Sequence, residues 1–334
     1  MPGRLGEIAP RGVPVQKRGI FMTISVARAG SATRVRRVRR AVRPYWYVLP
    51  AVLLIGFWLY RPLVETFRLA FYDWGMVPGT VPEYVGLKNF LRLVNNANFA
   101  RAVRNTGFYI AGMLPFSIVL PLFLASATQN LVEGAKRTYR ALFFIPMMMS
   151  PVVVGSIFRW LLLPGNGLVS MLLANLGLYS ATDKSFFANP ALAKWVILFI
   201  TGWKMMGFST ILFSAALTNV NRQYYEAAML EGSKGFRAFR DITLPLISPT
   251  IMFMLMMTVL FTSQTTFVFI DMLTQGGPMN TSTNIFYMMY KYGFSDLNVG
   301  MSSAAGVLFF AVFGILGLVL TALSKRFSFY DNQG

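Results

Sequence analysis

The chain has 334 residues, of which 55% are hydrophobic and 13% are charged, and it contains neither His nor Cys. Soluble domains carry nearer a quarter of charged residues, so the apolar surplus must face something other than water. The missing residue types exclude any mechanism built on a Ser–His or Cys–His pair, and they disfavour zinc and iron–sulfur centres. The net charge of +19 is compatible with nucleic acid or with a membrane surface, and its location decides between them.

The basic charge is densest close to the N-terminus, where residues 34–43 read RVRRVRRAVR. This cluster directly precedes a long apolar stretch and has no interleaved aromatic residues. We therefore interpret it as a topology anchor beside anionic lipid rather than as a nucleic-acid site. Residues 1–44 show no helical period and are predicted to form a basic, disordered cytoplasmic segment. Both Met1 and Met22 are possible starts of the chain.

Six apolar stretches have the length of about 20 residues that a helix needs to cross a bilayer. They are residues 45–72, 106–127, 139–163, 191–217, 249–273 and 301–323. One such stretch could be a buried helix of a soluble protein, but six in one chain cannot. The sequence therefore predicts an all-α integral membrane protein with six transmembrane helices over residues 45–327, followed by a short tail, residues 328–334.

Lys and Arg predict the orientation of these helices, because cytoplasmic loops of membrane proteins carry an excess of them. With the N-terminus in the cytoplasm, 20 of these residues fall on the cytoplasmic side and 6 on the outside. We therefore expect both termini of the chain to be cytoplasmic.

The loop between the fourth and fifth stretches, residues 221–248, differs from a plain connector. Its sequence predicts a short helix over residues 224–231, ended by Gly232 in a left-handed conformation. Ser233 is predicted to cap a second helix that runs through Asp241. The loop is then a helix–turn–helix on the cytoplasmic side. An interfacial amphipathic helix without a partner is the alternative interpretation.

This loop resembles the EAA motif of permease subunits of ABC importers. The matching residues are Glu226, Ala227, Ala228, Gly232, Ile242, Leu244 and Pro245. In that family the loop is a coupling helix that docks in a groove of the ATPase subunit. The resemblance therefore implies a type I importer permease fold, also called MetI-like, and it assigns these residues to coupling.

The resemblance extends over residues 45–327 and is similar to the carbohydrate branch, the type of the maltose and glycerol-3-phosphate permeases. It rests on short stretches in order, among them FYDW at 71–74, VGLKNF at 85–90 and LTQGGP at 273–278, whereas Arg61 departs from the common pattern. It implies import of a sugar, oligosaccharide or related derivative across the bacterial inner membrane. Implied partners are a second homologous permease, two ATP-binding subunits and an extracytoplasmic binding protein, with membrane lipid around them.

The chain has no G-x-x-x-x-G-K-[ST] loop for ATP. We therefore expect no enzymatic activity, no metal and no cofactor in this chain, with ATP and Mg²⁺ bound by the partner ATPases. A self-sufficient secondary transporter or channel is the alternative, but it predicts internal repeats and midplane carboxylates that the sequence lacks. An intramembrane enzyme would need a general base, for which no His, Cys or central carboxylate pair is available.

Lys204 lies about 20 Å into the fourth stretch, close to the bilayer midplane, and hydroxyl side chains on the fifth stretch reach the same depth. Such hydroxyls often only join helices. The resemblance instead implies a sugar site on these two helices, and Lys204 leaves an anionic solute open. The implied residues are Thr201, Lys204, Met205, Phe208, Thr258 and Thr262. The identity of the solute, and whether this subunit or its partner holds it, do not follow from the sequence.

Overall fold

The computed structural model describes residues 45–129, 131–179 and 185–327. The predictions for residues 1–44 and for the tail 328–334 therefore lie outside the described residues. The chain divides into two units, residues 1–62 and 63–334. The described part of the first unit is helical, includes the π-helical turn η1 (Gly56–Tyr60) and exposes its apolar side chains.

Among the described residues, five helices are long and apolar enough to cross a membrane, in agreement with five of the six predicted stretches. They are Tyr45–Leu69, Ala97–Thr128, α9 (Ala193–Thr218), α13 (Ser248–Leu273) and Val299–Arg326. The first of these helices ends with α2 (Arg61–Leu69), and the last lies within α15 (Val299–Phe327). The second consists of α4 (Ala97–Leu114), η2 (Pro115–Val119) and α5 (Leu120–Thr128). The second helix begins at Ala97 rather than near residue 106, because the Asn96 side chain caps it, accepting a hydrogen bond from the Asn98 N–H at 2.9 Å.

The third predicted stretch is not one straight helix, and this corrects the sequence prediction. It consists of α6 (Glu133–Met148) and α7 (Pro151–Leu161), whose axes meet at 93°. Met149 and Ser150 between them are extended, with ψ of 140° and 136°. A residue that precedes proline is driven out of the helical region, so Pro151 ends α6 and begins α7.

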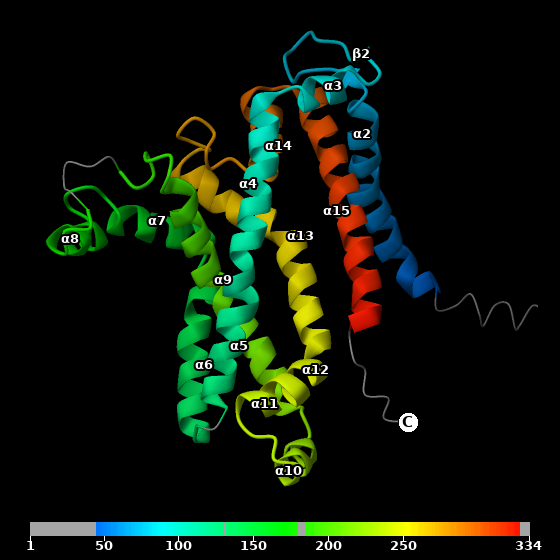
Figure 1. Cartoon of the computed structure of the whole chain (residues 1–334). Helices are drawn as coiled ribbons and strands as arrows, with labels where there is room; N and C mark the ends of the chain where they lie inside the picture. The colour runs from blue at the N-terminus through cyan, green and yellow to red at the C-terminus, as the bar shows by residue number, and fades with distance from the viewer. Residues whose placement is uncertain (1–44, 130, 180–184, 328–334) are drawn as a thin grey trace, which may run out of the picture. The chain divides into compact units, whose positions relative to one another are not determined.

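Within the second unit, α9 packs against α6, α5 and α13, and α13 also packs against α4, α7 and α15 (Figure 1). The largest buried apolar cluster lies where α4, α7, α9 and α13 meet and includes Tyr109, Ile197 and Phe269. Burial of α9 is thus set by neighbours on several sides, which explains why its sequence is apolar all round.

Short elements lie at the N-terminal end of α4, the end that is remote from α10 (Arg222–Leu230). Figure 1 shows α3 at this end. The antiparallel strands pair Tyr72 with Tyr84. Asn89 is fully buried and donates to the carbonyls of Ala70 and Tyr72 at 3.1 and 2.9 Å. The elements are β1 (Tyr72–Asp73), β2 (Glu83–Tyr84), α3 (Lys88–Val94), α14 (Ile285–Tyr290) and the turn η4 (Lys291–Ser295), while α8 (Leu168–Asn175) follows α7.

The loop between α13 and α14 is held by buried hydrogen bonds. The Asn284 side chain donates to the Ser263 carbonyl at 2.8 Å and to the Thr266 hydroxyl at 2.9 Å. The Tyr109 hydroxyl donates to the Ser282 carbonyl at 3.0 Å. Buried polar groups are costly unless paired, so these bonds fix the loop against α4 and α13.

Candidate functional site

The loop that carries the EAA-like motif begins with α10. The Asn221 side chain caps this helix by accepting a hydrogen bond from the Gln223 N–H at 3.0 Å. The helix therefore starts slightly before the predicted residue 224 and ends at Leu230. Figure 1 shows α10 and α11 together at the end of α9 and α13 that is remote from α3.

Gly232 ends α10 as predicted, with φ of +79°. Its N–H donates to the Met229 carbonyl at 3.2 Å, and the N–H of Ser233 donates to the Ala228 carbonyl at 2.9 Å. These bonds close the helix end, and a residue with a Cβ would be strained at this φ.

The second helix of the loop corrects the sequence prediction. Ser233 does not cap it: the Ser233 hydroxyl oxygen is buried without a hydrogen-bond partner among the described residues. The Ser233 N–H is used to close α10, and the chain starts its next helix only after Gly235. That helix comprises α11 (Phe236–Ala238), η3 (Phe239–Thr243) and α12 (Leu244–Leu246), and it continues past the predicted end at Asp241.

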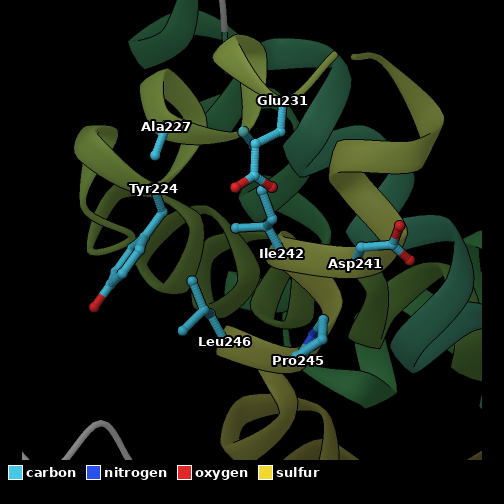
Figure 2. Close-up of a pocket in the computed structure, with 8 residues that line it drawn as sticks. Tyr224, Ala227, Glu231, Asp241, Ile242, Pro245 and Leu246 are labelled. Atoms are coloured by element: carbon cyan, nitrogen blue, oxygen red, sulfur yellow. The ribbon is translucent and has the colours of Figure 1, made fainter. Parts of the chain in front are cut away.

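The two helices of the loop are joined at the motif. The Tyr225 hydroxyl lies 2.8 Å from the Thr243 hydroxyl, and the small Ala228 is buried. Four of the seven motif residues line a single open groove of about 370 Å³ (Figure 2). Its lining consists of Tyr224, Ala227, Ala228, Glu231, Asp241, Ile242, Pro245 and Leu246.

The loop presents charge and apolar surface together. The Glu226 carboxylate pairs with Arg222 at 3.2 Å through exposed side chains, and such a pair contributes at most about 1 kcal/mol. Glu231 has no ion pair with any residue that the structure describes. Leu230 is 91% exposed and Phe236 is 79% exposed. Exposed apolar side chains beside available carboxylates indicate a surface for a protein partner.

The predicted substrate residues lie on α9 and α13, which pack against each other. Their hydroxyl groups are buried, and each donates to a backbone carbonyl one turn earlier: Thr201 to Ile197 at 2.8 Å, Thr258 to Met254 at 2.7 Å, and Thr262 to Thr258. The Thr258 hydroxyl oxygen also lies 2.7 Å from the hydroxyl oxygen of Ser117 on η2. Met205 and Phe208 are only half-buried and pack against the two main apolar clusters.

Lys204 differs from the rest of this set. Its side chain is 8% exposed, and its ammonium group donates to the carbonyls of Pro146, Met147 and Met149 at 3.3, 2.8 and 2.8 Å. Backbone carbonyls at a helix break leave no mark in side-chain patterns, so sequence reasoning missed these partners. The Ser150–Pro151 pair was the available signal for the break.

Comparisons with known proteins agree with this arrangement. A family model described as "Binding-protein-dependent transport system inner membrane component" matches residues 117–328. The sn-glycerol-3-phosphate transport system permease protein of Yersinia enterocolitica is 30% identical over 286 residues, which cover 85% of this chain and 93% of that protein. The corresponding protein of Escherichia coli O157:H7 is 29% identical over the same shares of the two chains.

Two solved structures share the fold. A chain of a bacterial ABC transporter involved in the import of the acidic polysaccharide alginate superposes with a TM-score of 0.75 at 25% identity, covering 88% of this chain and 99% of that one. A chain of the alginate transporter in complex with its alginate-bound periplasmic protein superposes with a TM-score of 0.76 at 24% identity, covering 87% and 96%.

Proposed function

The chain belongs to the family of binding-protein-dependent transport system inner membrane components, and we propose that it forms half of the translocation pathway of an ABC importer for a carbohydrate or a carbohydrate derivative. It is a multi-pass permease and not an enzyme. The observation that carries the proposal is the α10–α12 loop, in which Ala227, Ala228, Ile242 and Pro245 of the motif line one groove beside an exposed apolar tip, while Glu226, Gly232 and Leu244 lie outside its lining.

The proposed assembly contains a second homologous permease, two ATPases and an extracytoplasmic binding protein. The part of the chain that the structure describes has up to six candidate membrane spans when the bent pair α6–α7 is counted as one. The solved complex of the alginate transporter with its periplasmic protein supports the last of these partners. ATP and Mg²⁺ are then bound by the ATPases, and this chain binds neither.

The proposed coupling element is the motif itself, with Glu226 and Gly232 as its central residues. The exposed tip at Leu230 enters a groove of the ATPase, while the groove on the loop takes a side chain in return. The carboxylate of Glu231 favours a basic residue there, whereas the carboxylate of Asp241 already pairs with Arg237 and Arg240 at 3.8 and 4.0 Å. ATP-driven movement of the ATPase would thereby be transmitted to α9 and α13, which flank the loop in the chain.

The proposed solute class rests on relatives and on the chemistry of the two helices. The relatives named above transport sn-glycerol 3-phosphate and alginate, which both carry hydroxyl groups and negative charge. Half-buried Met205 and Phe208 offer apolar and aromatic surface, and Thr201, Thr258 and Thr262 offer hydroxyls. Lys204 lies at the same depth, and its donors are used within the chain like those of the hydroxyls, but an ammonium group, unlike a hydroxyl, has no lone pair left to accept a hydrogen bond.

Uptake by intact cells tests the function class. Deletion of the gene should abolish accumulation of a radiolabelled carbohydrate from a panel that includes glycerol 3-phosphate, a neutral oligosaccharide and an acidic oligosaccharide. Removal of extracytoplasmic proteins by osmotic shock should abolish the same uptake, and adding them back should restore it. Uptake that survives osmotic shock and follows the proton gradient would support the alternative, a secondary transporter.

Cysteine labelling tests the proposed orientation, in which both termini and the α10–α12 loop are cytoplasmic. The chain has no natural Cys, so Leu230→Cys and Met279→Cys each introduce a single reactive thiol at a position 91% and 76% exposed. An impermeant maleimide should label Met279→Cys in intact cells and Leu230→Cys only after permeabilisation. The reverse pattern would reject the orientation.

A further inference from the structure

The break between α6 and α7 creates backbone carbonyls that have no partner within the helix. The last four carbonyls of any α-helix lack an N–H four residues later in the same helix. At Met147 the missing donor would be residue 151, which is Pro151 and carries no N–H. Because the lipid interior contains no water to take its place, such groups must be satisfied within the protein.

Lys204 supplies the missing donors from another helix. Its ammonium group has three N–H bonds, and the structure gives it three carbonyl acceptors, those of Pro146, Met147 and Met149. A positive charge is also stabilised at the C-terminal end of a helix by the helix dipole. The charge and the donor count of Lys204 are therefore both matched to the end of α6.

The packing of α9 on α6 brings the ammonium group to this place. At Gly207, one turn from Lys204, an added Cβ would overlap the carbonyl oxygen of Phe143 on α6. The two backbones are therefore in close contact there. This contact fixes the distance between α9 and the end of α6, which the Lys204 side chain spans. The extended Met149 and Ser150 then turn the chain into α7 at 93°.

We propose that Lys204 is a positioning residue that caps the C-terminus of α6 and holds the bend between α6 and α7, rather than a ligand of the transported solute. The half-buried surface of α9, with Met205 and Phe208, is left to face the solute. This inference concerns the shape of the permease and does not depend on the identity of the solute.

A distance measurement across the bend tests the proposal in the full-length chain, within its assembled transporter in lipid nanodiscs and without solute. Spin labels at Leu142→Cys and Trp160→Cys occupy exposed positions on α6 and α7. For 18 residues, a straight helix would separate the two positions by about 27 Å, whereas a right-angled bend separates them by about 19 Å. The unmodified background should give the shorter distance.

Lys204→Met keeps the length of the side chain and removes its donors, so the distance should lengthen or spread by several ångströms. Lys204→Arg keeps the charge and the donors and should restore the shorter distance. Lys194→Met is the matched control, since Lys194 lies on the same helix with its ammonium group 4.6 Å from the Phe108 ring centroid, and it should leave the distance unchanged.

An unchanged distance in Lys204→Met would overturn the proposal. If that variant does not assemble, Lys204→Gln replaces it, because Gln is neutral and shorter but still carries N–H donors. A changed distance in Lys204→Gln with a normal one in Lys204→Arg supports the positioning role, and normal distances in both overturn it. Because no transport is measured, failure of the proposed function would not alter this result.

Discussion

The α10–α12 loop and the membrane-spanning helices of this chain differ in how their polar side chains are placed. In the loop, Glu226 and Glu231 are exposed, and their carboxylates are held only by a weak surface pair or by none among the described residues. In the interior, Thr258, Thr262 and Lys204 are buried, and their donors are already used within the chain. Exposed polar groups are free to meet a partner, whereas buried groups must first stabilise their own fold.

The largest effect is expected at the turn of the loop, in Gly232→Pro. Proline holds φ close to −65° and cannot adopt the observed value of +79°. The end of α10 should therefore be displaced, and both uptake and transport-coupled ATPase activity should be abolished. Membrane insertion, measured by protease accessibility, should persist because no transmembrane helix is altered.

Gly232→Ala is the matched control for this turn. Its penalty should be only about 1–2 kcal/mol, the cost of a left-handed conformation for a residue with a Cβ. Uptake should be reduced but measurable. If both variants transport normally, the loop does not couple ATP hydrolysis to transport. The proposal that the exposed polar groups of the loop meet a partner is then rejected.

Charge reversal at Glu226 should give the next largest effect. Glu226→Lys places a cation where a carboxylate is offered to the partner, and it also repels Arg222. We expect loss of uptake with a normal amount of permease in the membrane, measured by immunoblot. Arg222→Ala removes only the exposed partner of Glu226 and should change the uptake rate less than fivefold, consistent with at most about 1 kcal/mol.

The sequence could predict the helix–turn–helix of the loop because the signals for it lie in the side chains. Small residues, a helix-ending glycine and a charged residue occur at set spacings, and the structure brings four of the seven motif positions to one groove. The prediction for Ser233 is wrong, because a serine that follows a turn resembles the N-cap of the next helix. Only the backbone bond from Ser233 to Ala228 shows that its N–H already closes the preceding helix.

The interior was predicted less completely for a physical reason. Hydropathy locates apolar segments, and it places four membrane helices close to their observed bounds, whereas the second helix begins at Ala97, well before the predicted residue 106. It does not distinguish a straight helix from one bent at Ser150, because both are equally apolar. Nor does it reveal that the partners of Lys204 are carbonyl groups 55 to 58 residues earlier in the chain.

Gly207→Ala should sharpen the account of the interior. The new methyl group would overlap the Phe143 carbonyl, so α9 and α6 must separate. Overpacking of this kind costs about 1–3 kcal/mol, which should lower the thermal midpoint of the purified transporter, measured by tryptophan fluorescence. Gly314→Ala on α15 is the control, because an added Cβ there meets nothing within 4 Å, and its midpoint should not fall.

The smallest effect is expected for Thr262→Val, which keeps the shape of the side chain and removes the hydroxyl group. That hydroxyl donates to the Thr258 carbonyl, but its oxygen still has lone pairs that can accept a bond from a sugar hydroxyl. Such a bond contributes roughly 1–1.5 kcal/mol, or about tenfold in affinity. We therefore expect the KM for uptake to rise about tenfold, with only a small change in the thermal midpoint.

Thr265→Val provides the comparison for Thr262→Val, because Thr265 lies on the same helix and its hydroxyl likewise donates to a backbone carbonyl, that of Phe261, at 3.1 Å. A hydroxyl that serves only its own helix should give a small change in stability and none in KM. Normal KM values in Thr262→Val, Thr258→Val and Phe208→Ala together would move the solute site away from α9 and α13, to the partner permease. In that case the buried hydroxyls of this chain only join its helices. Polar groups of the loop would then serve a partner, and polar groups of the membrane-spanning helices would serve only the fold.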